Sequence, residues 1–235
     1  MRFISRKARV KGILEGESVI LGPCSIGNKS LIGLNVIVGY PVRKKVQAFP
    51  FSENFALDKF DRISAGAKIG DNCIIRSGTI IYEDVVIGNW VETGHNVLIR
   101  EGSTIGDKTR IGTSVKLDGV VKVGKNVSVQ SNVYLPHLTE IENDVFLGPN
   151  VVLTNDPYPP SRRRMGILVE KGAVIGANAC IVVPAKIGAR SVVCAGALVT
   201  KDVPSGMVVL GAPAKPYITR DEYDRKTDKW EEGAR

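Results

Sequence analysis

Residues 105–129 read IGDKTRIGTSVKLDGVVKVGKNVSV, and this stretch repeats with a period of six. An aliphatic residue stands at every sixth position, here called i, and a small or β-branched residue follows at i+4. The repeat forms three blocks, whose i positions cover residues 14–38, 63–153 and 169–199. Of these 27 positions, 26 are Ile, Leu or Val, and the exception is Thr93.

A period of six matches neither the 3.6-residue repeat of an α-helix nor the two-residue alternation of an open sheet. It predicts an all-β fold, the left-handed parallel β-helix, in which one hexad forms one flat side of a triangular coil and three hexads complete a turn. Stacked coils pair their backbone hydrogen-bonding groups along the axis. The aliphatic residue at i fills the centre of the prism, and the small residue at i+4 fits near the corner. Glycine is frequent at i+1, where we expect it to ease the bend into the next side. The number of hexads predicts about nine coils.

Two interruptions predict loops that leave the prism, at residues 42–62 and 157–168. Each loop carries a basic cluster, which comprises Arg43–Lys45 in the first and Arg162–Arg164 in the second. We therefore divide the chain into a β-helix domain, residues 1–216, and a helical tail, residues 217–235. In the tail, Thr219 and Glu222 have the spacing of a capping box. We expect this helix to cover the open end of the prism, because an uncovered end exposes unpaired strand edges.

The composition narrows the function classes. No apolar run approaches the ~18 residues of a membrane span, and the N-terminus lacks an apolar signal segment, so we expect a cytoplasmic protein without membrane contact. Four cysteines without a C-x-x-C pair argue against a zinc knuckle or a disulfide framework, and Cys24 and Cys73 at i+4 are expected to be small core residues. The net charge of +8 comes without a nucleic-acid motif, so it favours an anionic small molecule over nucleic acid as a ligand.

The two histidines, His95 and His137, both stand at i+2. They are seven hexads apart, so they lie on different sides of the prism. Residues 18 apart share a side, which places His137 one coil, about 4.8 Å, from Asn155. Asp156 and the second loop follow directly, and His137 is therefore the preferred general base. A surface or subunit-interface histidine is the alternative for His137. For His95 we expect a structural position beside a row of asparagines, which comprises Asn96, Asn132 and Asn150.

Five segments of the chain resemble the hexapeptide-repeat acyltransferases: VQSNV, IENDVFLGPNVVLTNDPYP, VEKGAVIGANACIVVPAKIG, AGALVTKDVPSG and GAPAKP. Within that family they are most similar to the branch that N-acetylates nucleotide-linked amino sugars. The resemblance covers residues 14–216. It implies a homotrimer of parallel prisms, acetyl-CoA bound in the groove between neighbouring subunits, and a small-molecule sugar acceptor near the insertion loop. The positions that match acetyl-CoA contacts of the family are Ala177, Ala195, Thr200, Lys201 and Lys215.

The chain also departs from the family. Sugar O-acetyltransferases carry a histidine about where Asp156 stands, and the first 60 residues add coils and a loop that the nucleotide-sugar branch does not typically have. Despite these departures, the reaction that we expect is direct acetyl transfer to an amine. His137 would accept the proton, and a backbone N–H would stabilise the oxyanion. Asn132 and Asp156 are expected to orient the amine.

Asn155, Arg162 and Arg163 are expected to bind the acceptor, and the arginines are expected to reach its nucleotide diphosphate. Two alternatives remain: O-acetylation of a simple sugar or other small hydroxyl acceptor, and a scaffold without catalysis. A carbonic anhydrase built on the same prism needs three histidines around one zinc, and the chain has two, so no metal site is predicted.

Overall fold

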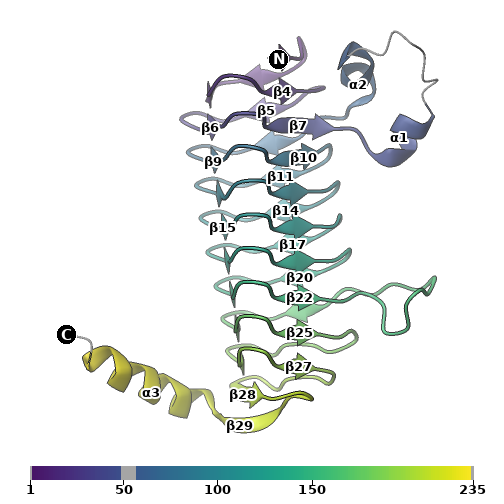
Figure 1. Cartoon of the computed structure of the whole chain (residues 1–235). Helices are drawn as coiled ribbons and strands as arrows, with labels where there is room; N and C mark the ends of the chain where they lie inside the picture. Colours follow the sequence, from purple (N-terminus) through teal and green to yellow (C-terminus); the bar gives the residue numbers. More distant parts are fainter. Residues whose placement is uncertain (1, 49–56, 234–235) are drawn as a thin grey trace.

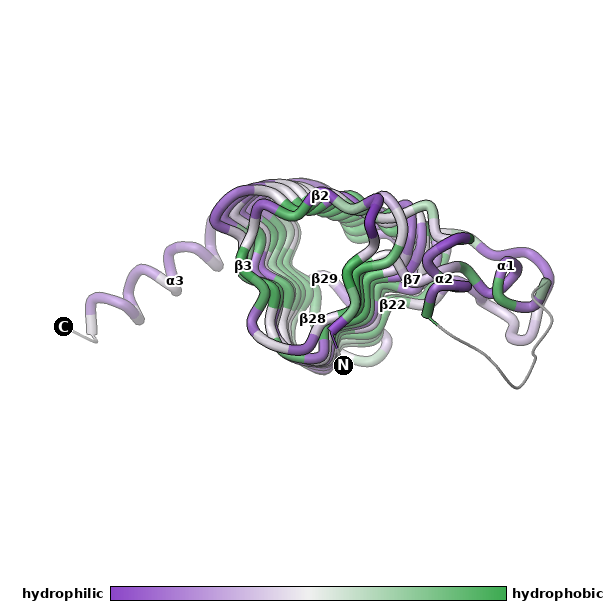
Figure 2. The backbone as a smooth tube through the Cα atoms, turned by 90° about the horizontal axis from the view of Figure 1, so that it is seen from above, coloured by the Kyte–Doolittle hydropathy of each residue, from purple (hydrophilic) through white to green (hydrophobic). Residues whose placement is uncertain are grey.

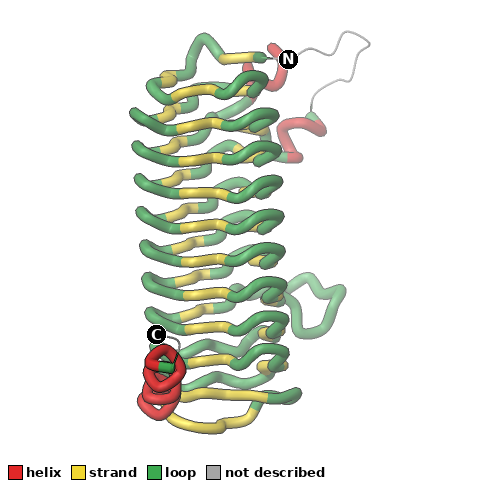
Figure 3. Tube along the Cα trace, turned by 60° about the vertical axis from the view of Figure 1, so that its left-hand side comes forward, coloured by secondary structure: helices red, strands yellow, loops and turns green. Residues whose placement is uncertain are grey.

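The computed structural model describes residues 2–48 and 57–233, and it is the predicted left-handed parallel β-helix (Figure 1). Three parallel sheets form the sides of a triangular prism, and loops join them at the corners (Figure 3). The sides are named in chain order.

The first side consists of β1 (Phe3–Ile4), β4 (Val19–Ile20), β7 (Ile37–Tyr40), β10 (Ile80–Tyr82), β13 (Leu98–Ile99), β16 (Lys116–Leu117), β19 (Tyr134–Leu135), β22 (Val152–Leu153), β25 (Cys180–Ile181) and β27 (Leu198–Val199). The second side consists of β2 (Arg9–Val10), β5 (Ser25–Ile26), β8 (Lys68–Ile69), β11 (Val86–Ile87), β14 (Thr104–Ile105), β17 (Lys122–Val123), β20 (Glu140–Ile141) and β23 (Leu168–Val169). The third side consists of β3 (Ile13–Leu14), β6 (Leu31–Ile32), β9 (Ile74–Ile75), β12 (Glu92–Thr93), β15 (Arg110–Ile111), β18 (Ser128–Val129), β21 (Phe146–Leu147), β24 (Val174–Ile175), β26 (Val192–Val193), β28 (Met207–Leu210) and the antiparallel β29 (Lys215–Thr219).

The interior of the prism contains the i and i+4 side chains, as predicted. On the first side, Ile81, Ile99 and Leu117 at position i are completely buried. Cys24 and Cys73, at i+4, are also buried, which confirms that they are small core residues. Because every coil adds one layer to the same hydrophobic column, the prism is stabilised along its whole length by contacts between neighbouring coils.

Contrary to the expectation from the sequence, the bend at each corner does not depend on the glycine at i+1. The left-handed backbone conformation occurs at i+3, for example at Asn126, Asn132 and Asn150, where asparagine is tolerated. The glycines at i+1 answer a different need. A Cβ at Gly106 would come within 2.7 Å of the Gly124 backbone in the next coil, so glycine there permits the coils to stack closely.

The stack is longer than the predicted nine coils, because strands begin at Phe3, before the regular repeat, and continue to β28. One position at the start of a block was also predicted wrongly. Ile63 is the last residue of a helix, and the stack resumes on the second side at Ile69, which pairs with Ile26. Ile63 has the chemistry of position i, but the stack passes from Val38 on the first side directly to Ile69.

Both insertions leave the prism between a first-side strand and the following second-side strand. The first, expected as a loop at 42–62, contains α1 (Arg43–Gln47) and α2 (Leu57–Ile63), and its residues 49–56 lie outside the described part. The second is a loop between β22 and β23, as predicted for residues 157–168. Because they start at the same corner, the two insertions project from the same edge of the prism (Figure 1), and the order of the first-side strands places them five coils apart.

The C-terminal helix α3 (Arg220–Glu232) has the predicted capping box between Thr219 and Glu222. The expectation that it covers the end of the prism is wrong. β29 turns back and pairs with β28, and this pairing covers the edge of the last third-side strand. α3 then projects away from the body, on the side opposite to α1 and α2 (Figure 2). Among the described helices, none has the length and apolar composition that crossing a membrane requires.

Candidate active site

The corner between the first and second sides, called the first corner, carries most of the predicted chemistry. The strand register of the first side aligns its i+2 residues in one row along the axis. In coil order, this row contains Glu83, Glu101, Gly119, His137, Asn155, Val183 and Lys201. The predicted neighbourhood of His137 and Asn155 is therefore confirmed: they occupy the same corner in adjacent coils.

His137 is half-buried, and its ring is fixed by a backbone carbonyl. Its Nδ1 lies 3.0 Å from the carbonyl oxygen of Gly119, in the preceding coil. A carbonyl oxygen can only accept a hydrogen bond, so Nδ1 carries the proton in the neutral imidazole. This tautomer leaves the lone pair on Nε2, which is the nitrogen that can act as a base.

A polar network that the hexad pattern does not predict lies beside His137. Arg100 donates to Asp118 at 2.7 Å and forms an ion pair with Glu101, and the Tyr134 hydroxyl donates to the other Asp118 oxygen at 3.0 Å. Burial and then the Asp118 carboxylate raise the pKa of Tyr134, while the Arg164 cation acts in the opposite direction. The 18-residue spacing of Arg100 and Asp118 could have predicted their contact, since residues with this spacing lie in adjacent coils at one corner.

The second loop is anchored directly after Asn155. The Asp156 carboxylate accepts hydrogen bonds from the backbone N–H groups of Tyr158 and Ser161. Desolvation opposes ionisation of Asp156, but the amides of Ser161 and Tyr158 outweigh it and lower the pKa of this group. The backbone N–H of Met165 closes the loop by donating to the Asn155 carbonyl at 3.0 Å. Asp156 therefore positions the loop, and its contact with an acceptor stays a prediction.

Asn155 also contains an unusual group. Its side-chain Nδ2 is buried and has no hydrogen-bond partner among the described residues. A buried donor left unpaired costs about 1–3 kcal/mol. Because this donor lies one coil from His137, it is a candidate for binding a ligand oxygen at the same corner.

The remaining predicted residues divide between two corners. Asn132 lies at the corner between the third and first sides, the third corner, where it donates to Asn150, which in turn donates to Asn178. Ala177 and Ala195 lie at i+2 of the same corner. Lys215 pairs with Leu210 at the end of β28, on the third side.

Thr200 and Lys201 belong instead to the first corner, with His137. Both are exposed, as are Arg162 and Arg163 in the second loop. The neighbouring Arg164 is the loop arginine whose charge acts on Tyr134 and Asp156. One subunit therefore does not bring Asn132 to His137, since the width of the first side separates them.

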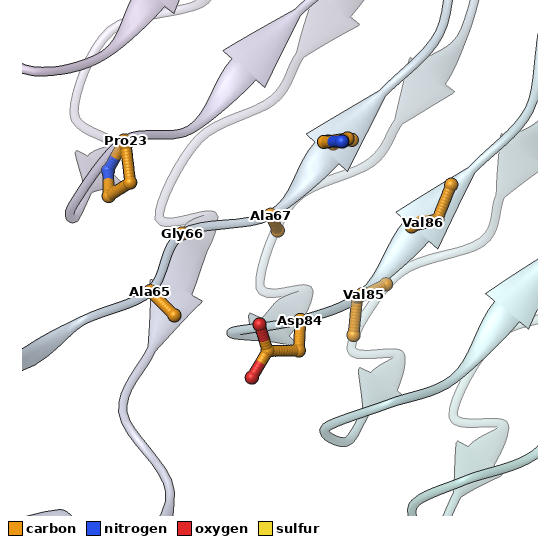
Figure 4. Close-up of a pocket in the computed structure, with 8 residues that line it drawn as sticks. Pro23, Ala65, Gly66, Ala67, Asp84, Val85 and Val86 are labelled. Carbon is orange, nitrogen blue, oxygen red and sulfur yellow. The ribbon is translucent and has the colours of Figure 1, made fainter.

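The surface near this network contains a cavity of about 550 Å³. It lies between α1 and the first side, and its lining residues are Tyr40, Pro41, Arg43, Val46, Gln47, Tyr82, Leu98, Arg100 and Asp118. A second cavity, of about 200 Å³, lies near Pro23 and Asp84 (Figure 4). Small side chains and backbone form most of its wall, including Ala65, Gly66 and Ala67, so it offers little chemistry for a reaction (Figure 4).

The cysteines are poorly suited to act as nucleophiles. Burial raises the pKa of Cys24 to about 11, and burial also raises the pKa of Cys73. Desolvation likewise raises the pKa of Cys180 and Cys194. A thiol reacts as its thiolate, so raised pKa values disfavour a covalent acyl-enzyme on cysteine. Within residues 2–48 and 57–233, no three His, Cys, Asp or Glu side chains are grouped as a metal site.

Comparison with known families finds two matches on the prism. Residues 66–101 match the family described as bacterial transferase hexapeptide (six repeats), and residues 166–201 match the hexapeptide repeat of succinyl-transferase. A 2,3,4,5-tetrahydropyridine-2,6-dicarboxylate N-acetyltransferase from Clostridium perfringens is 48% identical over 64 residues, which cover 27% of this chain and 26% of the relative. The match thus spans about a quarter of that curated relative.

Two solved structures match the chain at TM-scores below 0.5. A hexapeptide-repeat acetyltransferase from Vibrio cholerae, solved with acetyl coenzyme A, has 26% identity and a TM-score of 0.45, and the match covers 50% of this chain and 70% of that one. A UDP-N-acetylglucosamine acyltransferase from Bacteroides fragilis has 16% identity and a TM-score of 0.49, and the match covers 96% of this chain and 76% of that one.

Proposed function

Because the chain belongs to the hexapeptide-repeat acyltransferase family, we propose that it transfers the acetyl group of acetyl-CoA to an amino group of a nucleotide-linked sugar. The observation that carries the proposal is the state of His137. Its Nδ1 is committed to the Gly119 carbonyl, so Nε2 is available as a base at the foot of the second loop. A neutral histidine in this tautomer can accept a proton at Nε2 without any change in its position.

The reaction is a direct transfer. The acceptor nitrogen attacks the thioester carbonyl carbon, the carbon–sulfur bond breaks, and the CoA thiolate leaves. Nε2 of His137 accepts the proton that the acceptor nitrogen loses. The imidazolium then donates this proton to the CoA thiolate. The raised pKa values of the four cysteines support this route over one through a cysteine acyl-enzyme.

Asn155 is the proposed stabiliser of the developing oxyanion, together with a backbone N–H. Its buried Nδ2 has no partner among the described residues and lies at the corner of His137, one coil away. A fixed donor contributes most when it is satisfied only in the transition state. Asp156 would hold the loop that begins beside this point, and the Arg164 charge acts on Asp156.

The split of the site over two corners supports a homotrimer. His137 and Lys201 lie at the first corner, while Asn132, Ala177 and Ala195 lie at the third. A parallel neighbour in a cyclic trimer can place its third corner against this subunit's first corner. Acetyl-CoA then lies between the subunits, with the small side chains of Ala177 and Ala195 leaving room for it. In this arrangement, the third corner of the neighbouring subunit brings its Asn132 to the acceptor amine.

Release of CoA thiol tests the proposal, measured with UDP- and dTDP-linked amino sugars, free amino sugars, simple sugars and serine. We expect turnover with the nucleotide-linked amines. Turnover confined to simple hydroxyl acceptors would show that the protein is an O-acetyltransferase. Thiol release that no acceptor increases would favour a scaffold without catalysis. Either of these two results overturns the proposal.

A further inference from the structure

We infer that the cavity between α1 and the first side binds the nucleoside of the acceptor. This inference rests on the proposed function and assigns the part of the substrate that the reaction does not touch. The cavity, of about 550 Å³, falls within the range of roughly 300–1,000 Å³ that is usual for small-molecule sites. Its wall combines aromatic rings with a few polar groups, as such sites do.

The aromatic part of the wall is preassembled. The rings of Tyr40 and Tyr82 lie 5.1 Å apart, and Phe60 of α2 packs edge-on against Tyr40 at 5.4 Å. The Arg100 guanidinium lies over the Tyr82 ring, 5.9 Å from its centre. Tyrosine rings and an arginine plane are the groups on which a nucleobase stacks, and this stacking is worth about 1–3 kcal/mol per base.

The polar part suits a ribose and a phosphate. Asp118 lines the cavity with a carboxylate that can accept hydrogen bonds from hydroxyl groups, and Gln47 adds a side-chain amide. Arg43 is an exposed cation on the rim. Arg100 is already neutralised by Glu101 and Asp118, so Arg43 is the lining cation available to a phosphate.

The strand register connects the cavity to His137. Asp118 precedes Gly119, the residue whose carbonyl holds His137, and Asp118 itself binds Tyr134 of the next coil. Tyr82 lies three coils from His137, and Asp118 lies one coil away. Tyr40 of β7 also lines the cavity and lies one coil beyond Tyr82, so at about 4.8 Å per coil the lining residues extend from about 5 to 19 Å along the axis from His137. A nucleoside in the cavity would direct its diphosphate and sugar towards the imidazole and Arg164.

The insertion that forms the outer wall is held firmly. The carboxylate of Glu83 is completely buried and accepts from the backbone N–H of Val42 at 2.9 Å and of Ala65 at 2.5 Å. It also binds the Lys45 ammonium at 2.7 Å. One carboxylate thus fixes both ends of the insertion and α1 between them, which keeps the cavity open in a defined shape.

Two variants and a matched control test the inference. Arg43→Ala removes the rim cation, Val46→Trp fills the cavity, and Lys44→Ala removes an exposed cation of the same helix that does not line it. Binding of UDP and dTDP is measured by calorimetry, and KM is measured for a nucleotide-linked amino sugar and for the same sugar without its nucleotide. We expect Arg43→Ala and Val46→Trp to weaken nucleotide binding and to raise the first KM by about 10-fold or more. Lys44→Ala should change neither value, and the KM of the free sugar should not change in any variant.

The outcomes separate the two proposals. If the unaltered protein binds UDP or dTDP and the two cavity variants bind equally well, the nucleoside lies elsewhere and the inference is wrong, while acetyl transfer to the nucleotide sugar still stands. If the unaltered protein binds neither nucleotide and acetylates free sugars alone, the inference is also wrong. If nucleotides bind in an Arg43-dependent manner but no amine is acetylated, the proposed function fails and the cavity assignment holds.

Discussion

Among the described residues, the hydrogen-bond partner of the His137 Nδ1 is a neutral carbonyl, that of Gly119. A carbonyl oxygen can only accept a hydrogen bond, so it fixes the tautomer of the ring. The ring is thus prepared to accept a proton at Nε2. Gly119 itself adopts φ +87°, a conformation that other residues rarely take, so the carbonyl that holds His137 depends on this glycine.

Substitution of His137 distinguishes the two acceptor classes. A sugar amine has a pKa near 8 and is partly neutral at pH 7, so it needs less help than a hydroxyl. With an amine acceptor, we expect His137→Gln to retain measurable activity, and its deficit to shrink as the pH rises above about 8. With a hydroxyl acceptor, the loss should be about 10²–10⁴-fold throughout. The measurement is a pH–rate profile of thiol release.

His95→Gln is the matched control, because His95 is an exposed histidine at i+2 of the third corner. It should retain the activity and pH profile of the unaltered protein. A large loss in His95→Gln with none in His137→Gln would assign the base to the third corner.

The buried thiol of Cys24 makes a prediction about stability. Its pKa rises from 9.0 to about 11 through burial, so the folded state favours the protonated thiol. The corresponding stabilisation is complete below pH 9 and is lost as the pH rises to about 11, because the unfolded chain ionises first. Two pKa units correspond to about 2–3 kcal/mol. Denaturant unfolding between pH 8 and 11 should show this decline, and Cys24→Ala should reduce it by that amount.

Cys180→Ala is the control for this series, because the Cys180 side chain is only half-buried. It should leave most of the alkaline decline in place. An equal decline in the Cys24→Ala protein would mean that other groups, such as lysines and tyrosines, produce the whole effect.

At the scale of elements, one buried acid joins the first insertion to the prism. Glu83 stands at i+2 of the first corner, in the row of His137, but its carboxylate is used entirely on Val42, Lys45 and Ala65. The Lys45 ammonium is 40% exposed and can turn to water, but the backbone N–H groups of Val42 and Ala65 would lose their acceptor, at about 1–3 kcal/mol for each buried unpaired donor. The insertion can escape this cost by opening while the stacked coils remain closed.

We therefore expect Glu83→Ala to open the first insertion locally. Trypsin should cleave between residues 43 and 62 much faster, while the circular dichroism of the prism remains that of the unaltered protein. Glu140→Ala removes the acid of an exposed pair with Lys122 and should have no measurable effect. Unchanged cleavage in Glu83→Ala would show that α1 and α2 are held by their aromatic contacts alone.

The hexad repeat predicts the elements of the prism well, because one rule of position decides the environment of each side chain. It places His137 and Asn155 in adjacent coils by arithmetic alone, and the register confirms this. The same rule misplaced Ile63, since the identity of a residue at position i does not reveal where an inserted helix ends. It also gave no account of Glu83, because the partners of this acid lie in the insertion, which the period does not describe.

The candidate site was predictable in its positions and less so in its contacts. The spacing assigned Asn132 and His137 to different sides of the prism, but it could not show that Asn132 donates to Asn150 or that Asp156 caps its own loop. These contacts depend on side-chain directions at the corners. For the same reason, the network around Asp118 emerged only from the structure.

At the scale of the whole molecule, a stack of parallel coils must protect its two ends. An open end presents unpaired N–H and C=O groups to any other strand, and it is a site of aggregation. At the C-terminal end, β29 reverses and pairs antiparallel with β28, from Met207 opposite Thr219 to Leu210 opposite Lys215. This reversed strand breaks the parallel repeat, so another coil cannot add to the third side in the same way.

Two truncations separate the contribution of β29 from that of α3. α3 has no buried residues, and its first turn is anchored by Arg220, which donates to the carbonyl of Arg190. A chain ending at Thr219 loses α3 but keeps β29, and we expect its melting temperature to fall by only a few degrees and its solubility to remain. A chain ending at Gly211 also loses β29, which exposes the β28 edge, and it should aggregate and melt at a clearly lower temperature. Light scattering and calorimetry on the two proteins make the comparison. Equal melting temperatures and solubilities of the two truncated proteins would show that the edge of β28 needs no cover. If the chain that ends at Thr219 already aggregates, the protective role belongs to α3.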